Sequence, residues 1–170
     1  MVVQLNKTSK FVFFLFIVSF VTFSNTSYGS ALEQGEKAHN FTLETNTSKS
    51  LSLEELKGKI VVINFWTTWC TYCQEELAEL TTFYEAKKED VDLIAVNLTS
   101  SEQSKQEVLQ FINHSNIPFT VLMDVNGEVA AKYKIIGIPT TFIINKKGMV
   151  IKKVLGPVTA EMLSQIIDGM

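Results

Sequence analysis

The chain has 170 residues, which is the usual length of one domain with a single substantial core. Its formal net charge is −3 and its 15 basic residues are all lysines, so the charge gives no indication of a nucleic-acid surface. The sequence has no arginine and therefore lacks the bidentate guanidinium that a phosphate or peroxide site could use. We expect one domain that does not bind nucleic acid.

The first thirty residues are typical of an export signal. Lys7 and Lys10 precede an apolar run at residues 11–23, and small polar residues follow it. The run is shorter than the roughly 20 residues of a comfortable transmembrane helix, and no clean cleavage motif follows it. We therefore predict either a cleaved signal peptide or a membrane anchor at residues 1–30, with one domain over residues 31–170. Both alternatives place that domain outside the cytoplasm, secreted or anchored to the outer face of the cell membrane.

Strand and helix patterns then alternate along the chain. Alternating Phe41 and Leu43 predict a short edge strand or a hairpin, and a single helical turn is expected at residues 53–57. Residues 60–66 (IVVINFW) form a continuous β-branched and aromatic run, which is typical of a strand buried on both faces. After Cys70, apolar residues recur at three- and four-residue steps and predict an amphipathic helix.

The second half of the domain continues the alternation and ends in a hairpin and a helix. The predicted elements are a strand at 91–98, a helix at 102–113, a strand at 119–124, a short helix at 129–133, a hairpin at 140–155 and a helix at 158–167. Met162, Ile166 and Ile167 are expected to face the core. This order predicts an α/β fold with a central mixed sheet flanked by helices.

The only two cysteines, Cys70 and Cys73, lie two residues apart where the buried strand passes into a helix. Unpaired N–H groups and the helix dipole favour a thiolate at a helix N-terminus, which suits Cys70 as the exposed nucleophile. Cys73 lies one turn later and would be the inner, resolving thiol. The pattern therefore predicts a redox-active disulfide that needs no other cofactor.

Two other uses of the cysteine pair remain open from the residues alone. A metal site needs at least three protein ligands, and the two histidines, His39 and His114, lie far from both cysteines in the sequence, so we predict no metal. A purely structural disulfide would close a loop of only a few residues and would stabilise the fold little.

The segment Phe65–Cys73 (FWTTWCTYC), followed by Gly137–Phe142 (GIPTTF), resembles the thioredoxin superfamily. More narrowly, residues 36–168 resemble the exported TlpA/ResA-like thiol–disulfide oxidoreductases, because the order of elements also agrees. The resemblance implies a thioredoxin-like fold with an N-terminal hairpin and a helix–strand insert near residues 102–124.

The resemblance also assigns a substrate-facing surface. It implies that Pro139 is cis and faces the disulfide, which presents the backbone of Ile138 to an extended substrate chain. Trp69 is expected to cover the edge of the site, with plain core packing as its alternative. Tyr72 stands where the family usually has proline, and we expect it to alter either the fit of the substrate or the redox potential of the pair.

Glu76 matches a glutamate that ResA-like members place near the cysteines. A partly buried carboxylate there would have a raised pKa and could exchange a proton with Cys73. Asn64 stands where cytoplasmic thioredoxins carry a buried aspartate, so Glu76 is the remaining candidate for this role. The alternative is a solvated glutamate on the outer face of the helix.

The resemblance and the acidic residues near Cys70 together imply a reductase of disulfides in exported proteins, such as apocytochrome c. A membrane thiol donor would re-reduce it, and the N-terminal segment would contact the membrane if it is not cleaved. One rival is a thiol peroxidase of the AhpC/TSA kind, since Thr67 and Cys70 form a Thr-x-x-Cys motif, although Ile63 replaces the proline of that loop. The other rival is a peptide-binding module without turnover.

Overall fold

The computed structural model describes residues 32–170, so the predicted signal or anchor at residues 1–30 lies outside the described residues. The strands are β1 (Thr42–Thr45), β2 (Ser50–Ser52), β3 (Ile60–Trp66), β4 (Val91–Asn97), β5 (Thr120–Met123), β6 (Thr140–Ile144) and β7 (Val150–Leu155). The helices are η1 (Leu53–Leu56), α2 (Thr71–Lys87), η2 (Thr99–Ser101), α3 (Lys105–Ser115), α4 (Glu128–Lys132) and α5 (Ala160–Asp168), of which η1 and η2 are 3-10 turns.

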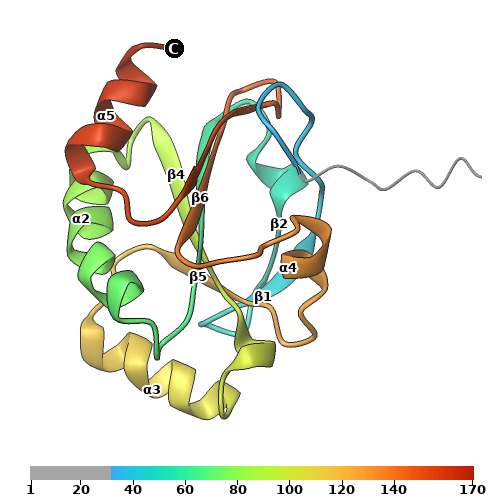
Figure 1. Cartoon of the computed structure of the whole chain (residues 1–170), viewed down its shortest axis with the longest axis vertical. Helices are drawn as coiled ribbons and strands as arrows, with labels where there is room; N and C mark the ends of the chain where they lie inside the picture. The colour runs from blue at the N-terminus through green and yellow to red at the C-terminus, as the bar shows by residue number, and fades with distance from the viewer. Residues whose placement is uncertain (1–31) are drawn as a thin grey trace, which may run out of the picture. The chain divides into compact units, whose positions relative to one another are not determined.

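The strands form one mixed sheet in the order β2-β1-β5-β4-β3-β6-β7 (Figure 1). The interior strand β3 pairs in parallel with β4, the middle strand of the sheet, and antiparallel with β6, and β4 pairs in parallel with β5. Both faces of β3 are covered, and for this reason its sequence is a continuous apolar run. The mixed α/β sheet and the thioredoxin-like fold are therefore confirmed.

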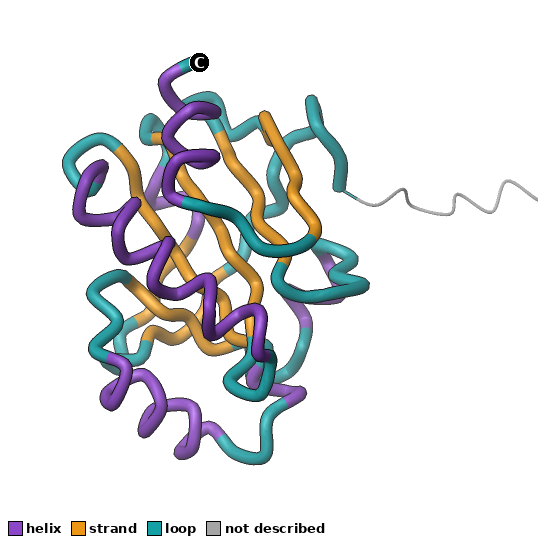
Figure 2. Tube along the Cα trace, turned by 60° about the vertical axis from the view of Figure 1, so that its left-hand side comes forward, coloured by secondary structure: helices purple, strands orange, loops and turns teal. Residues whose placement is uncertain are grey.

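Each face of the sheet carries its own hydrophobic core. Helices α2, α3 and α5 cover one face, where Phe83, Val108 and Leu163 pack with both cysteines (Figures 1 and 2). The helix α4, the turn η1 and the segment before β1 cover the other face, with Tyr133 fully buried at its centre. The site helix α2 thus packs directly on this face of the sheet, with α5 on one side of it and α3 on the other (Figures 1 and 2).

Two predicted elements differ from the structure. Helix α3 begins at Lys105 rather than at Glu102, because the Ser104 hydroxyl accepts a hydrogen bond from the Glu107 N–H and caps the helix there. In the C-terminal helix, Met162 was expected to face the core but is 39% exposed. The neighbouring residue, Leu163, is buried in the core instead. The helix begins at Ala160, where the Thr159 hydroxyl accepts the Met162 N–H at 3.1 Å and caps it.

Within residues 32–170, no helix is both long enough and apolar enough to cross a bilayer. In the same part of the chain, no three side chains of histidine, cysteine, aspartate or glutamate gather into a set of metal ligands.

Candidate active site

The cysteine pair lies at the start of α2, directly after the loop that follows β3. Cys70 is the N-cap residue, and its carbonyl oxygen accepts the first helical hydrogen bond, from the N–H of Gln74 at 3.0 Å. Its sulfur is joined to that of Cys73 and also accepts the Cys73 N–H at 3.1 Å. The predicted disulfide and its place at a helix N-terminus are therefore confirmed.

The two sulfur positions differ in their access to solvent. In this disulfide form Cys70 is 8% exposed and Cys73 is 1% exposed. Cys70 is therefore more buried than we expected for an exposed nucleophile, but it is the more accessible of the two cysteines. The order of attack expected from the sequence, with Cys70 outside and Cys73 inside, agrees with this geometry.

Glu76 lies one turn after Cys73 and is almost fully buried. Its Oε2 accepts a hydrogen bond from Asn64 Nδ2 at 2.9 Å, and its Oε1 accepts one from the backbone N–H of Val158 at 2.7 Å. Burial raises the pKa of this carboxyl to about 7, against the opposing effect of these two hydrogen bonds. A solvated glutamate on the outer face of the helix is therefore excluded.

Asn64 connects Glu76 to the hairpin that follows the proline loop. Its amide also donates to Thr141 Oγ1 at 3.0 Å, so the side chain bridges α2 and β6. The proline loop itself has the predicted cis bond, between Ile138 and Pro139. Ile138 packs against the core cluster that contains both cysteines, and the Pro139 carbonyl accepts the Gly156 N–H at 2.9 Å.

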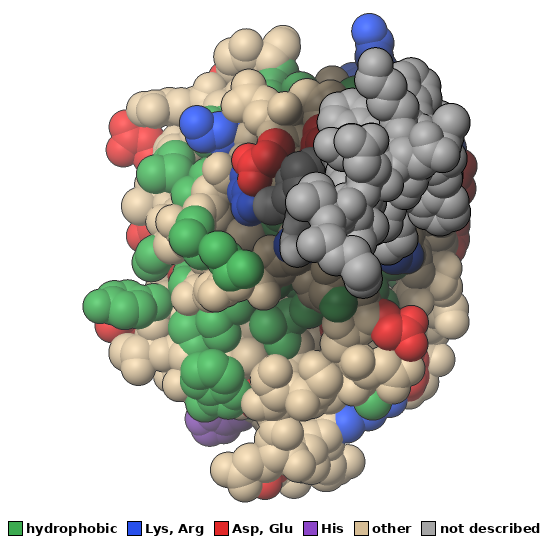
Figure 3. All heavy atoms as spheres, turned by 45° about the vertical axis from the view of Figure 1, so that its right-hand side comes forward, with side chains coloured by type: hydrophobic (Ala, Val, Ile, Leu, Met, Phe, Trp, Pro, Cys, Tyr) green, Lys and Arg blue, Asp and Glu red, His purple; other side chains and the backbone are tan. Residues whose placement is uncertain are grey.

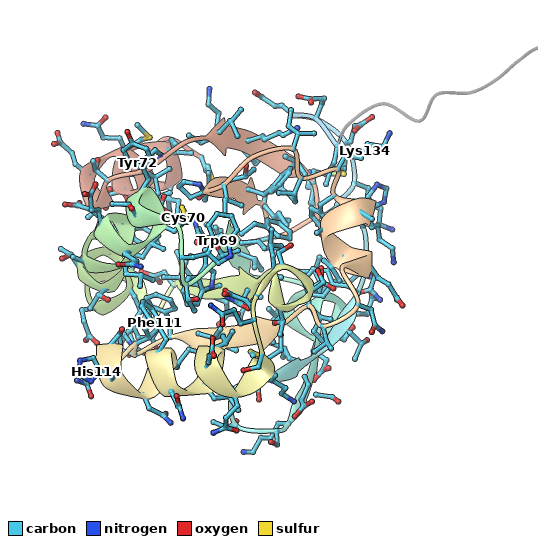
Figure 4. The ribbon with its side chains drawn as sticks, turned by 60° about the horizontal axis from the view of Figure 1, so that its bottom comes forward. Trp69, Cys70, Tyr72, Phe111, His114 and Lys134 are labelled. Atoms are coloured by element: carbon cyan, nitrogen blue, oxygen red, sulfur yellow. A yellow bond between two sulfur atoms is a disulfide. The ribbon has the colours of Figure 1, made fainter. Side chains whose placement is uncertain are left out.

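Two large aromatic side chains flank the disulfide on the surface. Trp69 is 60% exposed and Tyr72 is 64% exposed, and Figure 4 shows them on opposite sides of Cys70. The alternative prediction, that Trp69 packs in the core, is therefore wrong. Hydrophobic side chains also gather on part of the surface in the space-filling view (Figure 3). Exposed aromatic groups beside a reactive sulfur can contact a polypeptide substrate.

Glu102, Ser101 and Asn97 also contribute contacts beside the cysteines, and no sequence motif predicts them. Glu102 lies between η2 and α3 and accepts hydrogen bonds from Thr68, two residues before Cys70. Nothing in the local pattern marks it, because a lone acid after a run of polar residues is ordinary loop composition. The loops that follow parallel strands meet at one edge of the sheet. This general rule was the one indication that the loop after β4 would lie near the cysteines.

Three features define this protein as a thioredoxin-like thiol–disulfide oxidoreductase. They are a Cys-x-x-Cys disulfide at the start of a helix, a buried strand before that helix, and a cis-proline before an antiparallel hairpin. The chain belongs to the AhpC/TSA family, whose model matches residues 34–153, and within this broad family the relatives at 37% and 40% identity are named thiol–disulfide oxidoreductases rather than peroxidases.

Relatives agree with this class. The chain is 40% identical over 126 residues to sporulation thiol-disulfide oxidoreductase A of Bacillus subtilis, covering 74% of this chain and 76% of the relative. It is 37% identical over 139 residues to thiol-disulfide oxidoreductase ResA of the same organism, covering 81% of this chain and 76% of the relative. The crystal structure of StoA from Bacillus subtilis superposes with a TM-score of 0.70 at 38% identity, covering 76% of this chain and 96% of StoA. The protein is accordingly a thiol–disulfide oxidoreductase.

We expect the reduced protein to consume no more hydrogen peroxide than an ordinary thiol does. Ile63 lies inside strand β3 at the position of the proline in a peroxidase loop, and the sequence offers no arginine to assist the nucleophile. The measurement is peroxide consumption with dithiothreitol as the reductant, with Cys70→Ser as the control. A saturable turnover that depends on Cys70 would contradict this prediction.

Proposed function

We propose that this protein acts outside the cytoplasm and reduces disulfides in exported proteins, such as apocytochrome c, through Cys70 and Cys73. The observation that carries the direction is the setting of the two sulfurs. Trp69 and Thr71 beside Cys70 are uncharged, while the buried carboxyl of Glu76 lies one turn beyond Cys73. Acids near a thiolate raise its pKa, which favours the disulfide form and makes the couple more reducing.

The exchange transfers two electrons in two steps. The Cys70 thiolate attacks one sulfur of the substrate disulfide, forms a mixed disulfide with it and releases the other substrate sulfur as a thiolate. Cys73 then loses its proton, attacks the sulfur of Cys70 and releases the second substrate thiolate. The substrate gains two electrons and takes up two protons, and the enzyme is left with the disulfide between Cys70 and Cys73.

Glu76 is the proposed proton acceptor for the second step. A pKa of about 7 keeps part of the carboxyl ionised and part protonated at neutral pH, which suits a group that must accept and return a proton. Its position one helical turn after Cys73 places it near the thiol that has no direct access to solvent. Re-reduction of the disulfide by a membrane thiol donor completes the cycle.

Trp69, Tyr72, Ile138 and Pro139 form the proposed substrate-binding surface. The first two supply exposed aromatic area on either side of Cys70. Ile138 is half-buried and Pro139 is buried, and the proposed contact with an extended chain is through the backbone of Ile138. The location outside the cytoplasm rests on the sequence of residues 1–30, in which a basic flank precedes a short apolar run. A disulfide substrate persists in such a compartment.

The direction of electron flow is tested by the midpoint potential of the Cys70–Cys73 couple in dithiothreitol redox buffers. We expect a value closer to the roughly −270 mV of thioredoxin than to the roughly −120 mV of a strong oxidant. A dithiol form more stable than the disulfide, with a potential near the oxidising value, would contradict the reductive role.

The substrate class is tested by trapping with Cys73→Ala, which leaves Cys70 able to form a mixed disulfide that no second thiol resolves. Expressed in its native host as the full chain, this variant should accumulate mixed disulfides with exported proteins that contain cysteine. The matched control, with both cysteines replaced by alanine, should trap none. Recovery of the same partners with the control, or of cytoplasmic proteins alone, would contradict the proposal.

A further inference from the structure

We propose that Glu102 is a positioning residue that fixes the loop in front of Cys70 and, with Ser101, the orientation of the Trp69 ring. The proposal rests on thiol–disulfide exchange at Cys70 and is independent of the direction of electron flow. If the protein oxidised its substrates instead of reducing them, the same contacts would position the same sulfur, that of Cys70.

Both carboxylate oxygens of Glu102 hold this loop. Oε1 accepts the backbone N–H of Thr68 at 2.7 Å, and Oε2 accepts the Thr68 hydroxyl at 2.6 Å. Hydrogen bonds to a carboxylate are shorter and stronger than neutral ones. One side chain thus fixes both the backbone and the side chain of a residue only two positions before the nucleophile.

Glu102 is also hydrogen-bonded to a residue of the sheet. Its Oε1 also accepts a hydrogen bond from Asn97 Nδ2 at 2.8 Å, and Asn97 is fully buried at the end of β4. The Asn97 amide oxygen in turn accepts the Thr99 hydroxyl at 2.9 Å, so the side chain is held at both ends. Because β4 pairs in register with β3, with Trp66 opposite Asn97, the loop is positioned relative to the strand from which it emerges.

The neighbouring tryptophan is fixed by the same segment. Trp69 Nε1 donates to the Ser101 carbonyl at 3.0 Å, although most of the Trp69 side chain is exposed. An exposed side chain normally samples several rotamers, and a substrate that binds it must order it. A ring held in one orientation beside Cys70 avoids that loss (Figure 4).

The consequence is a rate effect at a residue that touches neither sulfur nor substrate. Disulfide exchange requires the attacking sulfur to be aligned with the sulfur that it attacks, and small misplacements of reacting groups slow such steps strongly. We expect loss of the Glu102 carboxylate to release Thr68 and Trp69 together and to misplace Cys70. Exchange should then slow in both directions.

The test compares Glu102→Ala with Glu102→Gln. Glutamine keeps an oxygen for the Thr68 N–H and offers an N–H to the Thr68 hydroxyl, but it carries no charge. Glu107→Gln removes the same charge from an exposed position on the same insert and is the matched control. Two rates are measured for each variant: reduction of a disulfide peptide by the reduced protein, and oxidation of the dithiol form of the same peptide by the oxidised protein.

We expect Glu102→Ala to slow both rates about tenfold or more, while Glu102→Gln and Glu107→Gln stay within about twofold of the parent. In proton–nitrogen spectra, the Trp69 indole N–H should shift and exchange faster with solvent in Glu102→Ala, whereas the buried Trp66 signal serves as an internal reference. Parent-like rates and Trp69 signals in Glu102→Ala would overturn the proposal. Equal losses in the alanine and glutamine variants would also overturn it, because the charge alone would then be responsible.

A second variant covers the case in which Glu102→Ala does not fold. Thr68→Val removes only the hydroxyl bond to Oε2 and keeps the backbone bond to Oε1. It should slow exchange by a few-fold and shift the Trp69 indole signal in the same direction. A parent-like rate together with an unchanged Trp69 signal would overturn the proposal without reference to the alanine variant.

Discussion

Replacing Cys70 with serine should abolish disulfide exchange, with the rate falling at least about 10³-fold to the background of the assay. A serine hydroxyl is not ionised at neutral pH and cannot form a mixed disulfide. The remaining thiol, Cys73, is buried and cannot meet a substrate sulfur directly. The measurement is reduction of a disulfide peptide by the reduced protein, with binding of the same peptide measured separately.

The comparison with Cys73→Ala sharpens this result. That variant should also fail to turn over, but its Cys70 should react once and remain as a mixed disulfide with the substrate. The difference between the two variants follows from the unequal burial of the two sulfurs. If Cys70→Ser retained turnover, or if it and Cys73→Ala trapped substrate equally, the assigned order of attack would be wrong. Unchanged function in vivo for Cys70→Ser would instead favour the peptide-binding module.

Replacing Glu76 with glutamine should stabilise the oxidised protein at pH 8 by about 3 kcal/mol, since one pKa unit corresponds to about 1.4 kcal/mol. The folded-state pKa of about 7 lies above the ordinary value of 4.5. Between these values the folded protein binds more protons than the unfolded chain, so its stability falls as the pH rises. The contribution of the neutral carboxyl is fully present below about pH 4.5 and is lost as the pH passes 7.

Urea unfolding of the oxidised protein at several pH values between 5 and 8 measures this effect. The parent should lose stability across that window, and Glu76→Gln should lose much less. Glutamine preserves the acceptor for the Val158 N–H, and reversal of the Asn64 amide would present its oxygen to the new amide. Glu75→Gln, at an exposed position on the same helix, is the control and should follow the parent. Parallel curves for the parent and Glu76→Gln would contradict the raised pKa.

The same variant separates stability from chemistry. If Glu76 accepts the proton of Cys73, glutamine should slow the resolving step by roughly 10²-fold and remove its pH dependence near 7. Reaction of Cys70 with a small disulfide should change little, because that step does not use Glu76. A variant that is more stable at pH 8 and slower only in resolution would fit both expectations.

Much of the fold could be predicted because its determinants are local or periodic. The run IVVINFW specified a strand with two covered faces, and the three- and four-residue spacing after Cys70 specified an amphipathic helix. The cysteine spacing at their junction, with Ile138-Pro139 before a hairpin, identified the class of enzyme. In the last helix Ile167 was predicted correctly as a core residue, but Leu163 rather than Met162 is buried, because both side chains are apolar and adjacent in the sequence.

The sequence by itself therefore determined the architecture and the redox pair, since each depends on neighbouring residues or on a short motif, whereas the cis bond at Pro139 was implied by the resemblance of GIPTTF to the thioredoxin superfamily. Only the tertiary structure decided that Glu76 is buried with Asn64 and Val158, and that Glu102 holds the loop before Cys70. Those contacts join residues 12, 82 and 34 positions apart in the chain. Periodicity specifies which face of an element is apolar, but long-range polar contacts depend on the register and ends of strands that meet only in the folded sheet.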